Sequence, residues 1–209
     1  RSSDDAAPVA VLPTGAGKSV VAAMICERMA SHDMRALVLC RTKELVEQNH
    51  AALSRLCPHL RSSVYCSGLK SKDTSGSFVF ATAQSAANKI EEFGQRDLVL
   101  IDEAHQVPKR ESSQYQKIIS GLRENGSRAR LIGLTATPYR VDGGAIAGDD
   151  KQFTEIAFEK PLREMVDNKW LTPLSYIDAE SVDLSGVSIV AGDYDDHELG
   201  AVFGERCAI

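Results

Sequence analysis

Residues 9–19 read VAVLPTGAGKS, and this stretch indicates the fold class most directly. Residues 9–12 are a short apolar run, which predicts a buried strand. Two glycines follow, Gly15 and Gly17, and residues 18–30 then have the character of a helix. A buried strand that passes through a glycine-rich turn directly into a helix is typical of α/β proteins.

The same alternation continues along the chain. Apolar, β-branched runs predict strands at 36–40, 78–80, 98–101 and 130–134. Stretches of helical character predict helices at 43–56, 114–123 and 161–168. Apolar strands that alternate with helices favour a mainly parallel sheet covered by helices on both faces. The predicted fold is therefore α/β and doubly wound, with ligands at the carboxyl ends of the strands.

Composition limits the class of protein. The 209 residues are 43% hydrophobic and 25% charged, which excludes a disordered or collagen-like chain. The five cysteines are odd in number and never spaced CxxC, so we expect a reduced, cytoplasmic protein without structural zinc. No apolar run approaches the roughly 20 residues that a membrane-spanning helix needs. Residues 1–12 also lack the pattern of a signal peptide.

Acidic residues are concentrated towards the C-terminal end of the sequence. The net charge is −5, but eight of the 29 acidic residues and only one of the 24 basic residues lie in 178–209. The preceding residues carry a small positive excess, so a nucleic-acid partner is not excluded. We expect one domain over residues 1–175, with a mobile loop at 141–150, and an acidic linker or the edge of a further domain over 176–209.

The turn before the first helix has the spacing of a phosphate-binding loop. Small residues allow backbone N–H groups to surround a phosphate at a helix N-terminus. Lys18 would reach the β- and γ-phosphates of ATP, and the Ser19 hydroxyl would bind Mg²⁺. Leu12 stands where this motif usually has glycine, and the alternative is a glycine-rich turn with an incidental lysine. The predicted nucleotide-binding residues are Pro13, Thr14, Gly15, Ala16, Gly17, Lys18 and Ser19.

A second motif ends the strand predicted at 98–101. Residues 98–105 read LVLIDEAH, an apolar run followed by two carboxylates and a histidine. Asp102 would bind the metal ion, and Glu103 would act as the general base that activates water. Alone, this pattern is also that of an ordinary solvated strand end. Its position about 85 residues after the phosphate loop favours the catalytic interpretation.

With these two motifs, the chain resembles the first RecA-like domain of a superfamily 2 DEAD/DEAH-type helicase, a P-loop NTPase with a three-layer fold. RTKEL at 41–45, ATAQS at 81–85 and GLTATPYR at 133–140 are similar to further motifs of that superfamily, in the same order. The resemblance implies that one group of residues contacts the sugar–phosphate backbone of a nucleic acid: Thr42, Lys43, Thr82 and Gln84. It implies that a second group couples the nucleotide site to nucleic-acid binding: His105, Thr135 and Thr137.

Ordinary structural roles are the alternatives for several of these residues. Thr42 could cap a helix beside a solvated Lys43. Thr135 and Thr137 could belong to a turn before Pro138, and His105 could be an exposed histidine without a coupling role.

Within the superfamily, the motifs are most similar to bacterial RadD-type DNA-repair ATPases, which implies DNA as the partner and a nucleoid-associated location. The alternatives are the translocase domain of a restriction enzyme and a non-catalytic, ATP-gated nucleic-acid-binding module. The family's second RecA-like domain, with its Q-x-x-G-R-x-x-R motif, does not appear in these 209 residues. That motif would supply an arginine finger, so we expect these residues alone to hydrolyse ATP only slowly.

Overall fold

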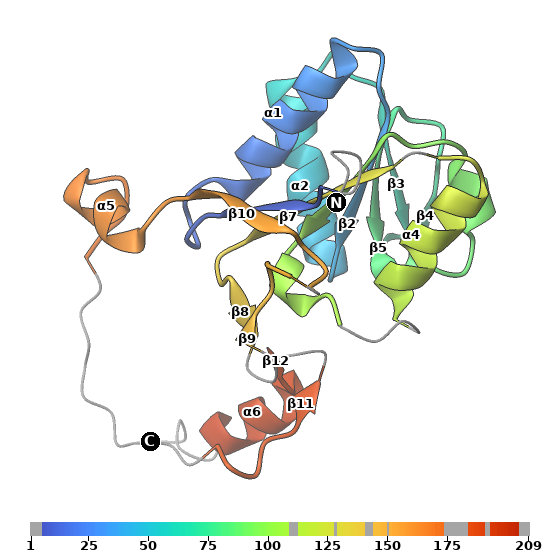
Figure 1. The fold of residues 1–209 in the computed structure, drawn as a ribbon. Helices are drawn as coiled ribbons and strands as arrows, with labels where there is room; N and C mark the ends of the chain where they lie inside the picture. The colour runs from blue at the N-terminus through green and yellow to red at the C-terminus, as the bar shows by residue number, and fades with distance from the viewer. Residues whose placement is uncertain are drawn as a thin grey trace.

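The computed structural model describes residues 6–108, 113–127, 129–140, 144–149, 151–173, 184–190 and 193–204. A single eight-stranded sheet forms its centre (Figure 1). The strands of this sheet are β1 (Pro8–Val11), β2 (Ala36–Cys40), β3 (Ser62–Cys66), β4 (Ser71–Lys72), β5 (Phe78–Thr82), β6 (Leu98–Asp102), β7 (Arg130–Thr135) and β10 (Glu155–Glu159).

The sheet order is β10-β1-β7-β6-β2-β5-β3-β4, and every neighbouring pair is parallel except β3 with β4. Strand β1 lies inside the sheet, where Val9 is opposite Gly133 on one side and Ile156 on the other. Because β1, β7, β6, β2 and β5 run in the same direction, their carboxyl ends meet at one edge. The α/β class with a mainly parallel sheet is confirmed.

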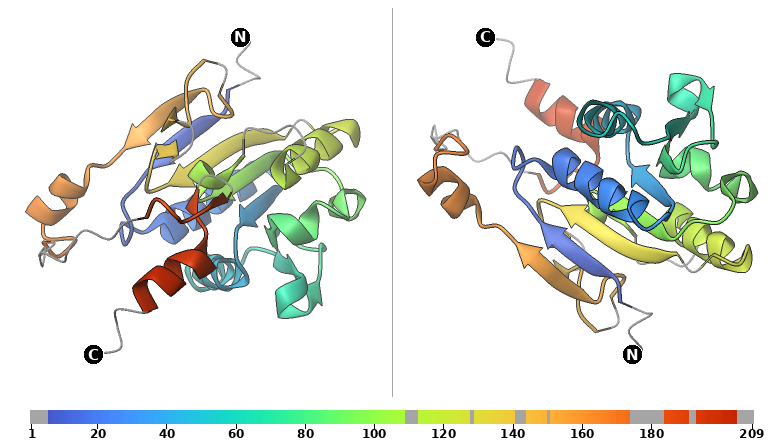
Figure 2. Two further views of the ribbon diagram at one scale, coloured as in Figure 1. Left: turned by 90° about the horizontal axis from the view of Figure 1, so that it is seen from below. Right: turned by 90° about the horizontal axis from the view of Figure 1, so that it is seen from above.

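Helices cover both faces of the sheet, as the apolar strands require. Helices α1 (Lys18–Ala30) and α2 (Lys43–Leu56) cover one face, and α3 (Ala83–Ala86) and α4 (Gln114–Glu124) cover the other (Figure 2). Strand β2 shows why two cores form. Leu37 and Leu39 pack on the α3–α4 side, whereas Val38 and Cys40 pack on the α1–α2 side.

The remaining elements are short. In the part of the chain that the structure describes, short 3₁₀ turns follow β3 at η2 (Ser67–Leu69), α3 at η3 (Ile90–Phe93) and β6 at η4 (Ala104–Gln106). The later elements are β8 (Tyr139–Arg140), β9 (Gly144–Ala145), α5 (Leu162–Asp167), β11 (Ile189–Val190), β12 (Asp193–Tyr194) and α6 (Asp196–Gly204). Among the described residues, no helix is both long and apolar enough to span a membrane.

Arg96 is a buried cation that ties two loops together. Its side chain donates to four main-chain oxygens, those of Thr74 (3.1 Å), Gly76 (3.0 Å), Ser77 (3.0 Å) and Phe93 (2.9 Å). Burial lowers the pKa of Arg96 to about 10, so the guanidinium stays charged at neutral pH. It thereby fixes the chain on both sides of β5.

Several structural elements were not predicted. Strand β3 is half polar in sequence, and β10 is an exposed edge strand with glutamate at each end. The loop predicted at 141–150 contains β9, which pairs with β8, while residues 141–143 and 150 lie outside the described residues. Part of the acidic segment predicted as a linker or domain edge forms the β11–β12 hairpin and α6, and residues 174–183 are again outside the described residues.

Candidate functional site

The predicted phosphate loop connects β1 to α1 at the carboxyl edge of the sheet. Gly15 and Gly17 have φ angles of +82° and +89°, which side chains with a Cβ rarely adopt, so both glycines are required by the backbone. Gly17 is the N-cap residue of α1, which begins at Lys18. The Leu12 N–H donates to the Thr135 carbonyl at 2.8 Å, so the loop is joined to the end of β7. Leucine replaces the usual glycine here without preventing this turn.

A cavity of about 660 Å³ opens beside this loop. The phosphate loop, the end of β6 and helix α2 line it together, with Lys18, Ser19, Asp102 and Glu103 among the lining residues. The structure therefore brings the two sequence motifs to one cavity. The α2 side supplies Leu45, Gln48, Ala52 and Arg55, which the motifs did not identify.

Asp102 is held by a residue that the sequence did not reveal. The Asn49 side chain on α2 donates to Asp102 Oδ2 at 2.8 Å, and the Glu103 N–H donates to Asp102 Oδ1 at 3.1 Å. Asn49 and Asp102 are only 3% and 5% exposed. The carboxylate thus has one oxygen fixed from each side before any metal binds. A polar residue on the buried face of a helix was the available signal for Asn49.

Glu103 lies at the centre of a chain of polar contacts. Its backbone is left-handed, with φ of +54°, which turns the side chain away from the strand direction. Glu103 Oε1 is 3.5 Å from Lys18 Nζ, and Glu103 Oε2 is 3.5 Å from His105 Nδ1. The predicted base therefore contacts both the predicted phosphate-binding lysine and the predicted coupling histidine.

The contact chain continues to the two threonines of residues 133–140. His105 Nδ1 lies 2.9 Å from Thr135 Oγ1. The Thr135 hydroxyl donates to the Thr137 carbonyl at 3.0 Å and accepts from the Thr137 N–H at 3.1 Å. When the single Thr135 hydroxyl proton is donated to the Thr137 carbonyl, His105 Nδ1 is the donor in its contact with Thr135. The turn predicted as the alternative for these threonines is present, and the contact with His105 exists alongside it.

The oxygen groups in the cavity fit a magnesium ion. Mg²⁺ prefers hard oxygen ligands and usually binds one or two protein groups together with substrate phosphates. Asp102 supplies a carboxylate and Ser19 a hydroxyl in the same cavity. The described residues contain no group of three or more His, Cys, Asp or Glu placed to hold a metal by themselves, so phosphate oxygens would complete the shell.

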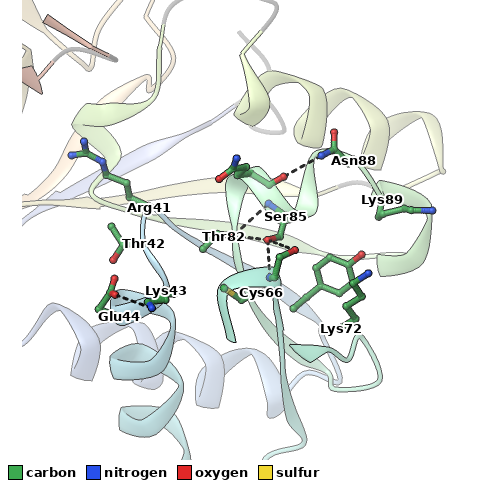
Figure 3. Close-up of a pocket in the computed structure, with 14 residues that line it drawn as sticks. Arg41, Thr42, Lys43, Glu44, Cys66, Lys72, Thr82, Ser85, Asn88 and Lys89 are labelled. Carbon is green, nitrogen blue, oxygen red and sulfur yellow. Dashed lines mark hydrogen bonds and ion pairs between the residues drawn. The ribbon is translucent and has the colours of Figure 1, made fainter. Parts of the chain in front are cut away.

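A second cavity, of about 680 Å³, lies further along the same edge of the sheet, at the ends of β2, β3 and β5 (Figure 3). It gathers all four residues predicted to contact nucleic acid, Thr42, Lys43, Thr82 and Gln84. Three more basic residues line it, namely Arg41, Lys72 and Lys89. In Figure 3, Arg41 and Lys43 lie on one side and Lys72 and Lys89 on the other, with Thr82 and Ser85 between them.

Both threonines of the second cavity are helix caps. Thr42 Oγ1 accepts from the Leu45 N–H at 3.4 Å, and Thr82 Oγ1 accepts from the Ser85 N–H, also at 3.4 Å. The capping role considered for Thr42 is therefore real. The Thr42 hydroxyl also hydrogen-bonds the Glu44 carboxylate, and the Thr82 hydroxyl donates to Ser85 Oγ at 2.8 Å.

Arg140, which follows the threonine motif, has a structural contact. Its side chain is buried and donates to the Val107 carbonyl, just after η4. This agrees with a structural role on its own domain.

Comparisons with known proteins agree with the fold. The family described as "Type III restriction enzyme, res subunit" (ResIII) matches residues 2–140. A 51.5 kDa protein of Lactococcus phage (isolate 7-9) is 26% identical over 193 residues, which cover 92% of this chain and 37% of that protein. Putative helicase 22 of Sulfolobus islandicus filamentous virus (isolate Iceland/Hveragerdi) is 28% identical over 178 residues, 79% of this chain and 30% of that protein. The chain thus spans about a third of the length of these curated relatives.

Two solved structures share the fold. The UvsW helicase from bacteriophage T4 has a TM-score of 0.57 at 23% identity, over 75% of this chain and 55% of that one. A nuclease-deletion mutant of the type ISP restriction-modification enzyme LlaGI, in complex with a DNA substrate mimic, has a TM-score of 0.57 at 18% identity, over 78% of this chain and 19% of that one. The RecA-like helicase fold is confirmed. The narrower resemblance to RadD, the nucleoid location and the domain boundary at residue 175 stay predictions.

Proposed function

The chain belongs to the ResIII family, and on that basis we propose that it is the ATP-hydrolysing motor domain of a superfamily 2 helicase or translocase that acts on DNA. The observation that supports this most strongly is the contact chain from Lys18 through Glu103 and His105 to Thr135. It joins the phosphate loop, the end of β6 and the end of β7 through charged and polar atoms.

In this proposal, each residue of the contact chain has a defined task. Lys18 exchanges its contact with Glu103 for phosphate oxygens, which frees the Glu103 carboxylate to accept a proton from the attacking water. Ser19 and Asp102 hold the magnesium ion, with Asp102 oriented by Asn49. The metal ion, when bound, supplies positive charge that stabilises the phosphoryl oxygens.

Coupling to the nucleic acid then follows from the same contacts. His105 contacts Glu103 on one side and Thr135 on the other, so a change in the position of Glu103 would alter both contacts. Thr135 is completely buried and its carbonyl accepts from Leu12, so a shift in this group is transmitted to the phosphate loop. The second cavity, with four basic residues and one acidic residue among those that line it, would bind the phosphate backbone of one strand.

The biological setting has two candidates. The ResIII match and the similarity to LlaGI favour the translocase of a restriction system. A DNA-repair role is the narrower hypothesis from the RadD-like motifs. The non-catalytic alternative is disfavoured, because a binding module would not need Glu103 placed between Lys18 and His105.

Two substitutions in the full-length protein test the proposal. Lys18→Ala should abolish tight Mg-ATP binding in isothermal titration, because it removes the cation from the phosphates. Glu103→Gln should leave ATP binding in place and lower hydrolysis by about 10² or more, the scale of a general base. Glu159→Gln, on the exposed edge strand, is the matched control and should change neither. Unchanged hydrolysis in the Glu103 variant would exclude it as the base.

A further inference from the structure

Trp170 is a large aromatic side chain that the protein leaves in solvent. It is the single tryptophan of the sequence and is 63% exposed. Its backbone is nevertheless fixed, because the N–H groups of Trp170 and Leu171 both donate to the Met165 carbonyl, at 2.9 and 3.1 Å. Lys169 precedes it with φ of +60° and turns the chain back after α5. An exposed aromatic ring on a backbone that is fixed by hydrogen bonds is suited to binding a ligand.

The segment that carries Trp170 is attached to the phosphate loop at both ends. At its start, the Lys160 N–H donates to the Val11 carbonyl at 2.9 Å, at the end of β1 and two residues before the loop begins. At its end, Leu171 packs so closely on Gly15 that a Cβ there would lie 3.1 Å from Leu171 Cδ2. Trp170 is the residue before Leu171, and consecutive Cα atoms are 3.8 Å apart, so the backbone of Trp170 lies close to the residue that contacts the loop.

The indole ring is also held in orientation. Lys160 Nζ lies 5.2 Å from the ring centroid, within cation–π distance, and the same ammonium pairs with Glu164. By contrast, the described residues that line the phosphate cavity include no aromatic ring. These residues can bind phosphates and a metal ion but present no aromatic surface to a base.

We propose that Trp170 stacks on the base of the nucleoside triphosphate whose phosphates occupy the loop at residues 13–19. This inference rests on the proposed function, and it adds the base subsite to it. The loop takes the triphosphate, and Trp170, positioned by Lys160 and Leu171, offers its indole face to the base. Stacking tolerates any base with a large π-surface, so the subsite would favour purine nucleotides without separating ATP from GTP.

The sequence offers a direct optical test, because Trp170 is its single tryptophan. Intrinsic fluorescence of this chain is titrated with Mg-ATP, with Mg-GTP and with Mg-tripolyphosphate, which has the phosphates but no base. We expect both nucleotides to change the Trp170 emission and tripolyphosphate to bind without that change. In calorimetry, Trp170→Ala should weaken ATP binding about 5- to 150-fold, the scale of one stacked base, and leave tripolyphosphate binding unchanged. Trp170→Phe keeps an aromatic face and should retain most of the affinity.

The possible outcomes separate the inference from the proposed function. If tripolyphosphate and ATP bind equally well, with no change in emission and no loss in Trp170→Ala, the base subsite is wrong and the phosphate site stands. Trp170 would then be an exposed ring for some other contact. If neither ATP nor tripolyphosphate binds, or if Lys18→Ala leaves both affinities unchanged, the proposed nucleotide site is wrong. The base subsite, which rests on it, is then wrong as well. Circular dichroism of both Trp170 variants verifies that they are folded.

Discussion

Replacing Asn49 with alanine removes the amide that holds the predicted metal ligand. Asn49 Nδ2 donates to Asp102 Oδ2 at 2.8 Å and lies 3.5 Å from Cys40 Sγ, in a site where both Asn49 and Asp102 are at most 5% exposed. A hydrogen bond to a charged group contributes about 1.5–3 kcal/mol, and little water can take its place here. For a domain of this size, about 2–4 °C of melting temperature is lost per kcal/mol, so we expect a decrease of about 3–12 °C.

The functional effect should be specific to the metal ion. Without the amide, one oxygen of Asp102 loses its fixed orientation, so Mg-ATP should bind more weakly while metal-free ATP is affected much less. Thermal melting and calorimetry with and without Mg²⁺ measure the two effects on the same samples. Asn125→Ala, at the exposed end of α4, is the matched control and should shift the melting temperature very little. A decrease below about 1 °C with an unchanged magnesium dependence would refute the positioning role of Asn49.

Three further outcomes follow from the second cavity, the buried cation and the cysteines. Lys43→Ala should weaken DNA binding about equally across sequences and lower the slope of log affinity against log salt concentration by about one unit, whereas Lys117→Ala on α4 should change neither quantity. A loss of affinity that depends on the DNA sequence would contradict contact with the sugar–phosphate backbone. Arg96→Met leaves four main-chain oxygens without their donor, so urea unfolding should show that the free energy of unfolding falls by about 4 kcal/mol or more. A fall of less than about 1 kcal/mol would mean that water replaces the guanidinium. Burial raises the pKa of Cys26 to about 12 and also raises that of Cys40, so neither thiol should react with iodoacetamide at about pH 8 in the folded protein. Mass spectrometry of labelled peptides measures this.

The sequence predicted the interior of the fold far better than its edges. Helices α1 and α2 begin and end at the predicted residues, because their apolar faces and the glycine or threonine before them are local signals. Strand β2 likewise follows from a continuous apolar run. Strands β3 and β10 have no such run. Strand β3 lies between β5 and β4 but is half polar, and β10 is a solvated edge strand, so both sequences look like loops.

The residues of the candidate site likewise divide into those with a local sequence signal and those without one. Lys18, Asp102 and Glu103 stand in local motifs, so their meeting at one cavity could be expected from the strand order of α/β folds. The contact of Asn49 with Asp102 joins residues 53 positions apart and depends on how α2 packs on the sheet. The contact of Leu171 with Gly15 spans most of the chain, and no local pattern encodes it.

The interior position of β1 has a consequence for how the protein is made. Val9 pairs with Gly133 and Ile156, so the strand that leads into the phosphate loop is synthesised well before either of the strands that pair with it. Pairing across more than 120 residues of sequence is slow, because the intervening chain must be ordered first. Until residues 155–159 leave the ribosome, β1 has one unpaired edge and α1 lacks a finished sheet beneath it. We therefore expect nascent chains that end before β10 to be sensitive to protease and dependent on chaperones, and resistance to appear only once that last strand has been translated.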